Sequence, residues 1–290
     1  MTQRIPNIAT IAGVDPSGGA GVLADTKTIS ALGGYACAVV AALTAQNTRA
    51  VAGVWPVPER FVAEQIDTLW ADVRIDACKI GMVGQGPVIE AIAGRLAHWK
   101  ATHVVLDPVM VAKSGAVLLD RAAVGALRES LLSQASVITP NLPEGGVLLE
   151  SRAPETLKEM FRAAERLRKL MRGDGDRWVL LKGGHLPGSE AIDLLHDGDR
   201  MIELAHVRID TRNTHGTGCT LSAALATLMP QSPDVPTAAR RAKAYLVHAL
   251  EHADELKVGE GHGPVHHLHA LWAAYERCGE RFDPESAKRR

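Results

Sequence analysis

The residues with the clearest chemical potential lie in the run NTHGTGCTL at positions 213–221. Gly216 and Gly218 allow the backbone to turn tightly and to present bare N–H groups. The helix expected directly after them adds partial positive charge at its N-terminus, where anions bind. Such a turn can hold the negative charge that develops on a phosphoryl group during its transfer. We therefore predict an anion hole formed by Gly216, Thr217 and Gly218, with Thr214 beside it.

Cys219 follows this turn and falls at the start of the expected helix. The pKa of a thiol is lowered at a helix N-terminus, so a thiolate that can accept a proton becomes accessible near neutrality. The alternative is a glycine-rich helix start with a buried, inert cysteine. Polar neighbours argue against that alternative, namely Thr214, His215, Thr217 and Thr220. We therefore predict that Cys219 is a catalytic base.

Acidic and basic side chains also follow short apolar runs that have the composition of strands. Lys182 precedes two glycines and offers a point charge that can bind phosphate groups, with a solvated lysine at a strand end as the alternative. Asp107 follows a β-branched run, and a role near phosphate and metal competes there with a simple turn. Taken alone, Asn141 and Glu144 fit a helix cap and a carboxylate in the first helical turn.

These side chains must be positioned by elements that alternate between strand and helix along the chain. Strands are predicted at Asn7–Ala12, Ala36–Val40, Cys78–Gly81, His103–Leu106, Ser136–Thr139 and Trp178–Lys182, with a hairpin at Ala191–His196 and Met201–Val207. Helices are predicted at Glu59–Val73, Val88–Trp99, Phe161–Met171, Gly218–Leu228 and Thr237–Leu256. This alternation is typical of a mostly parallel sheet flanked by helices. Ligands of such sheets bind outside the carboxyl ends of the strands, where the motifs above fall.

Length and composition indicate one domain over residues 1–278, followed by a polar tail at 279–290 that we expect to be disordered. The 290 residues are 46% hydrophobic and 22% charged, with a formal net charge of −1. This balance argues against a general binder of nucleic acid or of anionic membranes. No apolar run could span a bilayer, and Met1–Pro6 lacks the pattern of a secretory signal. We therefore expect a cytoplasmic protein whose four unpaired cysteines are reduced.

Several motifs occur in the order found in the hydroxymethylpyrimidine/phosphomethylpyrimidine kinases. The run NTHGTGCTLSA (213–223) resembles the anion-hole segment of that family. The other matching segments are AGVDPSGGAGVLADTKT (12–28), ALTAQNT (42–48), KIGM (79–82), VVLDPVMVAKSG (104–115), ITPNLPE (138–144), LLKGGH (180–185) and GPVHHLHALW (263–272). The resemblance spans residues 8–272. It implies a ribokinase-like three-layer α/β/α fold, ATP and Mg²⁺ as cofactors, and two successive phosphorylations of 4-amino-5-hydroxymethyl-2-methylpyrimidine.

The resemblance also implies roles for single residues. Asn141 and Glu144 match an Asn-x-x-Glu element that positions magnesium through water, so Glu144 and Asp107 are expected at the metal. The residues expected at ATP are Asp107, Asn141, Lys182 and Thr214. The wider superfamily usually has an aspartate base where this chain has Cys219, as is usual in the pyrimidine kinase branch. The family further implies a homodimer.

The glycine-rich loop at 15–21 fits neither the dinucleotide-binding fingerprint nor the P-loop pattern, so we assign it to the acceptor substrate. Asp15 and Asp25 are expected to line this site. Gln46 offers a donor and an acceptor side by side, which matches an exocyclic amine next to a ring nitrogen. The remaining residues assigned to the acceptor are Gly13, Met82 and Lys113. Leu23 stands where many family members have glutamine, which bears on acceptor preference.

Other functions remain open on the sequence. A pyridoxal-type kinase shares the anion hole, a thiol hydrolase would use Cys219 with His215, and a non-catalytic module would only bind the pyrimidine. The acidic residues and Lys182 would have no role in a hydrolase. Four histidines at 262, 266, 267 and 269 suggest zinc, but no cysteine or carboxylate accompanies them at ligand spacing. We interpret that stretch as a structural segment.

Overall fold

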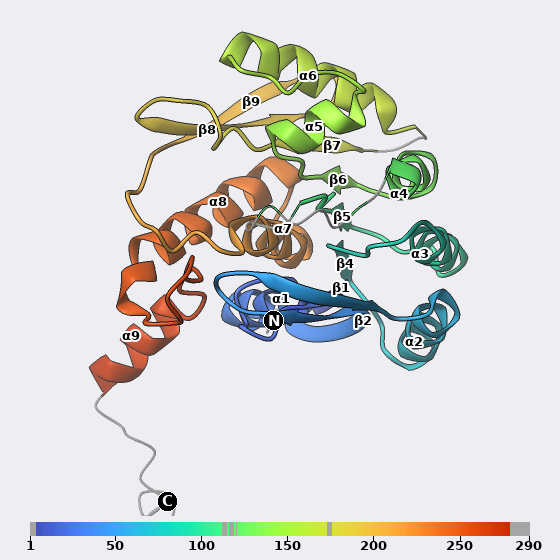
Figure 1. Ribbon diagram of the computed structural model, residues 1–290, viewed down its shortest axis with the longest axis horizontal. Helices are drawn as coiled ribbons and strands as arrows, with labels where there is room; N and C mark the ends of the chain where they lie inside the picture. The colour runs from blue at the N-terminus through green and yellow to red at the C-terminus, as the bar shows by residue number, and fades with distance from the viewer. Residues whose placement is uncertain (1–3, 112–114, 116–118, 120, 173–175, 279–290) are drawn as a thin grey trace, which may run out of the picture.

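The computed structural model describes residues 4–111, 115, 119, 121–172 and 176–278. Lys113 and the tail at 279–290 lie outside these residues. Within them a nine-stranded sheet runs through the protein in the order β3-β2-β1-β4-β5-β6-β7-β8-β9 (Figure 1). The strands are β1 (Asn7–Val14), β2 (Tyr35–Gln46), β3 (Val51–Pro56), β4 (Ala77–Ile80), β5 (Val104–Leu106), β6 (Val137–Ile138), β7 (Trp178–Leu181), β8 (Glu190–His196) and β9 (Met201–Val207).

The predicted mostly parallel sheet is confirmed. Neighbouring strands from β2 through β7 pair in parallel, and β8 and β9 form the predicted antiparallel hairpin at one end. The antiparallel edge strand β3 was not predicted. Its sequence, VAGVWP, holds a glycine and a proline and lies mostly exposed, so it lacks the alternation that marks a half-buried strand.

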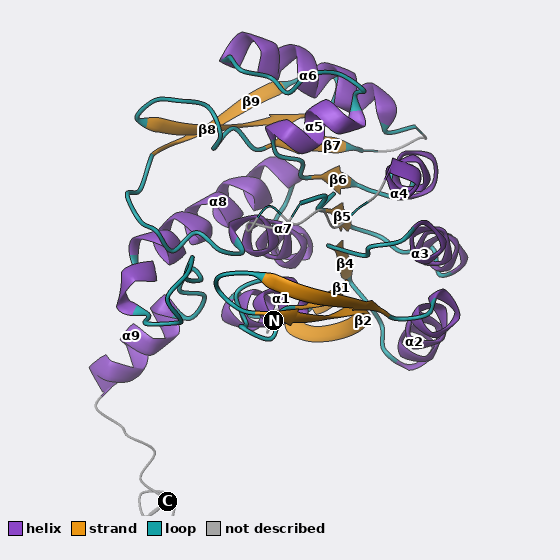
Figure 2. Ribbon diagram, viewed as in Figure 1, coloured by secondary structure: helices purple, strands orange, loops and turns teal. Residues whose placement is uncertain are grey.

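Helices cover both faces of the sheet, which confirms the three-layer α/β/α fold (Figures 1 and 2). On one face lie α1 (Gly21–Ala31), α7 (Thr217–Leu228) and α8 (Val235–Glu251). On the other lie α2 (Glu59–Asp72), α3 (Gly86–His98), α4 (Arg121–Ala126), the π-helical turn Leu127–Leu131, α5 (Leu142–Leu148) and α6 (Leu157–Leu170). Buried apolar side chains form one core on each face.

Local sequence explains where several of these helices begin. Asn141 caps α5, since its side chain accepts a hydrogen bond from the N–H of Glu144 while the Glu144 carboxylate accepts one from the N–H of Asn141. Thr156 and Asp234 cap α6 and α8 with one side-chain oxygen each. Helix α7 is apolar around most of its circumference because it lies between the sheet, α1 and α8.

The C-terminal segment passes close to the loop before α7 and then forms α9 (His269–Cys278), a helix that was not predicted. His266 and His267 are 3% and 4% exposed, in agreement with the structural interpretation of this stretch. Among the described residues, no three His, Cys, Asp or Glu side chains are placed to hold a metal ion. Within the same part of the chain, no helix has the length and apolar character needed to cross a bilayer.

Candidate active site

The turn before α7 is held in a conformation that only glycine adopts readily. Gly216 has φ +78°, and a Cβ built on it would lie 1.7 Å from the carbonyl oxygen of Gly19. The loop at 15–20 therefore packs directly on the turn. A Cβ built on Gly218 would lie 3.2 Å from Lys182 Nζ and 3.5 Å from Asp107 Oδ2. The N–H groups in the first turn of α7, which have no partner inside the helix, therefore lie beside the ion pair of Lys182 and Asp107.

That ion pair joins the residues that follow β5 and β7, the two strands on either side of β6. Lys182 Nζ lies 2.9 Å from Asp107 Oδ1, and the hydroxyl of Thr139 donates to the same oxygen at 3.1 Å. Ser222, on α7, lies 3.3 Å from Asp107 Oδ2. Burial acts to raise the pKa of Asp107, but the ammonium groups of Lys182 and Lys79 outweigh it and hold that pKa below its ordinary value. Asp107 is therefore an ionised carboxylate at neutral pH.

Glu144 belongs to the same cluster as well as to the helix cap. Its carboxylate is 7% exposed and accepts a hydrogen bond from the Asn141 N–H at 2.8 Å. Burial, and then the nearby negative charge of Asp107, raise the pKa of Glu144 to about 7, against the attraction of Lys182. Glu144 therefore caps α5 and also belongs to the charged cluster around Asp107. Because its pKa lies near neutrality, a proton and a cation can compete for its carboxylate.

The expected depression of the Cys219 pKa was wrong. Burial raises the pKa of the Cys219 thiol to about 11, and the carboxylates of Asp25 and Asp107 add to the rise, while Lys79 and the N–H of Gly21 act against it. Burial, together with the two nearby carboxylates, outweighs the effect of the helix N-terminus. In the absence of ligands Cys219 is therefore a thiol at neutral pH.

The acceptor loop is held by one carboxylate. Asp15 accepts hydrogen bonds from the Ser17 N–H at 2.9 Å and the Ala20 N–H at 3.0 Å, and His215 Nε2 lies 2.7 Å away. At 3% exposure Asp15 thus shapes the loop and fastens it to the anion-hole turn. His215 is bonded to Asp15 instead of Cys219, which removes the support for a thiol hydrolase.

Asp25 is placed differently from the sequence expectation. Its side chain is 0% exposed and forms an ion pair with Lys79, whose Nζ lies 2.8 Å from Asp25 Oδ2. The hydroxyl of Thr10 donates to the same oxygen at 2.5 Å. No surface of Asp25 is open to an acceptor molecule in this structure, so we do not carry the contact role forward.

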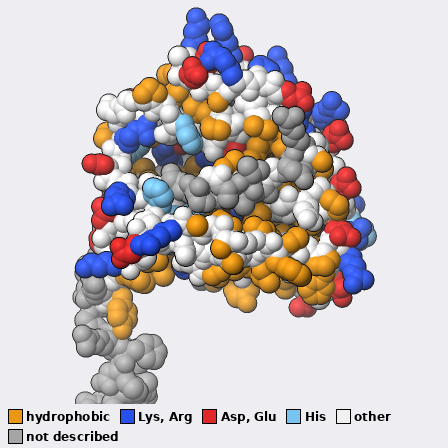
Figure 3. All heavy atoms as spheres, in the orientation of Figure 1, with side chains coloured by type: hydrophobic (Ala, Val, Ile, Leu, Met, Phe, Trp, Pro, Cys, Tyr) orange, Lys and Arg blue, Asp and Glu red, His pale blue; other side chains and the backbone are white. Residues whose placement is uncertain are grey.

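The other residues assigned to the acceptor substrate lie at the carboxyl ends of the strands as well. The Gly13 N–H donates to the Met82 carbonyl at 2.9 Å, so these two residues are neighbours. Gln46, at the end of β2, is half-buried, and its Oε1 lies 3.2 Å from the hydroxyl of Thr44. Thr44 in turn donates to the carbonyl of Val14, next to the acceptor loop. Figure 3 shows basic side chains and histidines around a hollow on the face viewed in Figure 1.

Sequence reasoning missed Thr139, Ser222 and Lys79. Thr139 and Ser222 fall inside segments that were assigned on other grounds, and a single hydroxyl there carries no signal of its own. Lys79 does carry one, since it stands in the strand ACKI, whose other residues are apolar and all of whose residues are buried. A buried lysine needs a partner, and none is visible from the sequence.

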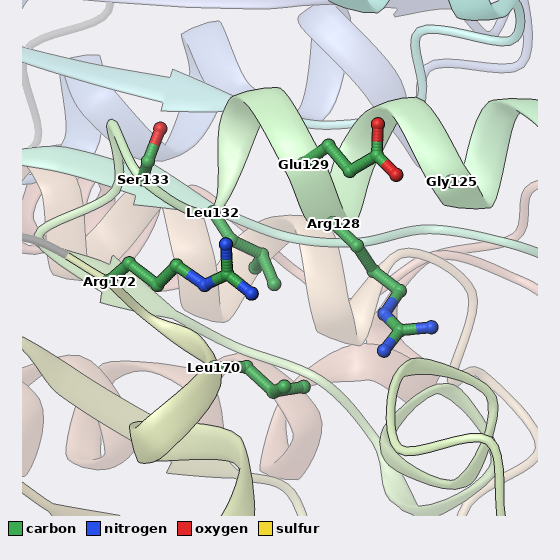
Figure 4. Close-up of a pocket in the computed structure, with 7 residues that line it drawn as sticks. All are labelled: Gly125, Arg128, Glu129, Leu132, Ser133, Leu170 and Arg172. Atoms are coloured by element: carbon green, nitrogen blue, oxygen red, sulfur yellow. The ribbon is translucent and has the colours of Figure 1, made fainter.

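A separate pocket of about 250 Å³ lies near the residues that precede β6 and β7, at the amino ends of these strands (Figure 4). Arg128 and Arg172 extend into it beside Leu170. The guanidinium of Arg128 is already paired with Glu150. None of the residues assigned from the sequence lines this pocket, so we do not include it in the site.

The chain was compared with known proteins. Residues 15–266 match the family model described as phosphomethylpyrimidine kinase. The chain is 50% identical over 266 residues to the hydroxymethylpyrimidine/phosphomethylpyrimidine kinase of Escherichia coli (strain K12), covering 92% of this chain and 98% of that one. It is 48% identical over 263 residues to the enzyme of the same name from Rhizobium meliloti (strain 1021), covering 91% and 97%.

Solved structures agree with this grouping. A phosphomethylpyrimidine kinase from Clostridium difficile 630 is 34% identical, with a TM-score of 0.73 over 85% of this chain and 100% of that one. An ADP complex of Bacillus subtilis pyridoxal kinase is 32% identical, with a TM-score of 0.83 over 91% and 98%. This chain belongs to the phosphomethylpyrimidine kinase family.

Proposed function

We propose that this protein transfers the γ-phosphoryl group of ATP to 4-amino-5-hydroxymethyl-2-methylpyrimidine and then phosphorylates the resulting monophosphate, as a step of thiamine biosynthesis. The observation that carries the proposal is the Asp107–Lys182 ion pair beside the glycine turn of α7. The ammonium of Lys182, the carboxylate of Asp107 and the first-turn N–H groups of α7 therefore surround one small volume. Phosphoryl transfer needs little more than such positioning and charge neutralisation.

Each residue of the cluster has a distinct task in this proposal. The N–H groups at Gly216–Gly218 would hold the transferred phosphoryl group, and Lys182 would meet the phosphates of ATP. Cys219 would accept the proton of the acceptor hydroxyl. Gln46 would pair with the aminopyrimidine, while Asp15 would keep the acceptor loop against the turn. Gln46 is half-buried and is not enclosed in the core.

Two carboxylates fit a magnesium ion at the ATP side of the site. Asp107 and Glu144 interact electrostatically, are almost fully buried and offer the hard oxygen atoms that Mg²⁺ prefers. Mg²⁺ is commonly held by one or two carboxylates together with substrate phosphates and water. When bound there it would neutralise phosphate charge. We therefore propose that Asp107 and Glu144 hold the ion with ATP.

A pyridoxal-type kinase is the second candidate, favoured by the TM-score of 0.83 to the Bacillus subtilis pyridoxal kinase. The two candidates separate in one assay, in which the protein is incubated with ATP, Mg²⁺ and either acceptor while ADP and phosphorylated products are followed by mass spectrometry. We expect the pyrimidine to be converted to its monophosphate and then its diphosphate, and pyridoxal to react more slowly. Turnover of pyridoxal alone would contradict the proposal.

We further propose a cytoplasmic homodimer. The β2–β3 end of the sheet carries exposed apolar side chains, including Leu43, Val54 and Trp55, at 49%, 45% and 73% exposure. Leu43 and Trp55 are paired across the two strands and therefore share one face, and exposed apolar side chains that lie together are a feature of subunit interfaces. This support is independent of the family resemblance, which also implies a dimer.

Glu144→Gln is expected to raise the concentration of Mg²⁺ needed for half-maximal activity and to spare acceptor binding. Because Mg²⁺ binds the ionised carboxylate, the wild-type protein should need roughly tenfold more Mg²⁺ at about pH 6 than at about pH 8, as protonation removes the carboxylate. The variant should show almost none of this pH dependence. Magnesium titrations of initial rate at several pH values measure both effects.

Glu159→Gln is the matched control for this prediction. Glu159 holds the same position in the first turn of α6 as Glu144 holds in α5, but it lies outside the site. It should leave the magnesium requirement unchanged. If Glu144→Gln behaved in the same way, Glu144 would be a helix cap only.

A further inference from the structure

Lys79 is a buried charge in the middle of the sheet. It lies in β4, between β1 and β5, and its side chain is 0% exposed. A Cβ built on Gly81 would lie 2.6 Å from Lys79 Nζ, so the side chain runs forward toward the carboxyl end of the strand. Both carboxylate oxygens of Asp25 lie within 3.0 Å of this nitrogen. The ammonium therefore lies near the carboxyl ends of the strands, where the active site is.

Cys219 is a neighbour of this ion pair. Helix α7, whose first turn holds Cys219, packs against α1 and β4, which carry Asp25 and Lys79, and the N–H of Gly21 acts on the Cys219 sulfur. Gly21 and Asp25 are one turn apart on α1 and so share a face of that helix. The charges that act on the sulfur are Lys79 from β4, Asp25 from α1, Asp107 from the end of β5, and Lys182 from the end of β7.

A buried ion pair is rarely the most stable choice for a core. Apolar side chains of similar volume are often as stabilising as the pair, whereas loss of one partner leaves a buried charge without compensation. The Lys79–Asp25 pair lies among buried apolar side chains of β1, β4 and α1. The pair is therefore better explained by what it does to the sulfur beside it than by stability.

We propose that Lys79 is a positioning residue for Cys219, and that the Lys79–Asp25 pair sets how readily this thiol gives up its proton. The ammonium stabilises the sulfur anion, while the Asp25 carboxylate opposes it and fixes the ammonium in place. The two partners thus act on the sulfur in opposite directions. The inference rests on the proposed role of Cys219 as a base, but its test uses neither ATP nor pyrimidine.

The test is the rate at which iodoacetamide alkylates Cys219 in the ligand-free protein, followed by peptide mass spectrometry between about pH 6 and pH 10. Thiolate is the reactive form, and one unit of pKa changes its amount about tenfold. Peptide mass spectrometry distinguishes the peptide of Cys219 from those of the other three cysteines, and Cys219 is only half-buried, so the reagent can reach it. Asp25→Asn should speed alkylation near neutrality roughly tenfold, and Lys79→Met should slow it.

Opposite signs are decisive because both substitutions break the same ion pair. A purely structural role would loosen the site in both variants and move alkylation in the same direction. Should Lys79→Met fail to fold, the double variant Asp25→Asn/Lys79→Met removes both charges and is expected to fold. It should react more slowly than Asp25→Asn alone, because only the latter keeps the ammonium.

The pair Asp67–Arg95, between α2 and α3, is the matched control. Asp67→Asn/Arg95→Met should leave the alkylation profile of Cys219 unchanged. Equal profiles in all variants, or shifts of one sign in both single variants, would overturn the inference. A protein without kinase activity that still shows the opposite shifts would instead count against the proposed function alone.

Discussion

Replacing Cys219 by alanine is expected to lower kcat roughly 10²–10⁴-fold, the range for loss of a positioned general base. The fold and ATP binding should persist, because the side chain is small and half-buried and the turn before it is fixed by Gly216 and Gly19. Steady-state kinetics give kcat, and calorimetry with ATP tests binding. An alanine variant as fast as the parent would reduce Cys219 to a small residue that allows close helix packing.

The raised pKa gives this prediction a second readout. Because the thiol pKa lies at about 11, the thiolate is scarce at neutral pH and its amount grows as pH rises. The kcat of the parent should therefore rise with pH through the neutral range. Cys219→Asp should recover part of the rate lost in the alanine variant, because a carboxylate can also accept the proton. A covalent mechanism predicts instead a phosphorylated or acylated Cys219, which intact-protein mass spectrometry would detect.

Much of the fold follows from local sequence. β5 and β7 are continuous apolar runs, and β4 is apolar apart from Lys79, as expected for strands buried on both faces. All three were located to within about two residues. Strand β3 escaped because an exposed edge strand with glycine and proline has no periodic pattern. Helix α1 escaped because glycines crowd its start and its apolar face is weak. Pattern therefore predicts strongly apolar or periodic elements better than exposed edge strands and weakly amphipathic helices.

The site was predictable to the extent that it consists of strand ends. Asp107 and Lys182 come together because parallel strands align their carboxyl ends, a rule that needs no coordinates. Long-range pairings do not follow from any such rule. Asp15 and His215 are 200 residues apart, and Asp25 and Lys79 are 54 apart. Asp25 was therefore assigned to the acceptor when its carboxylate is occupied inside the protein.

The prediction that the Cys219 pKa is lowered was wrong for a related reason. The helix N-terminus is visible in the sequence, and its effect on a thiol is a local one. The opposing effects come from burial and from carboxylates on α1 and after β5, which only the tertiary structure brings to the sulfur. The local rule gives the sign of the helix contribution to the pKa, but burial and the two carboxylates reverse the net shift.

Gly216→Ala is expected to lower kcat by roughly 10²–10³-fold, the effect of losing donors to a developing oxyanion. An alanine Cβ would lie 1.7 Å from the Gly19 oxygen and 2.8 Å from the Gly19 carbonyl carbon, so backbone would have to move. The acceptor loop and the turn would separate. The N–H groups of the turn would then no longer face the volume beside Lys182 and Asp107.

Gly33→Ala separates this clash from backbone strain. Gly33 has the same φ of +78°, but a Cβ there would meet nothing within 4 Å. Both variants should carry about 1–2 kcal/mol of left-handed strain, seen as a small fall in Tm. Only Gly216→Ala should lose kcat, because only there does the methyl group separate two loops of the site. Equal kcat in the two variants would show that the turn tolerates the displacement and that its N–H groups do not hold the phosphoryl group.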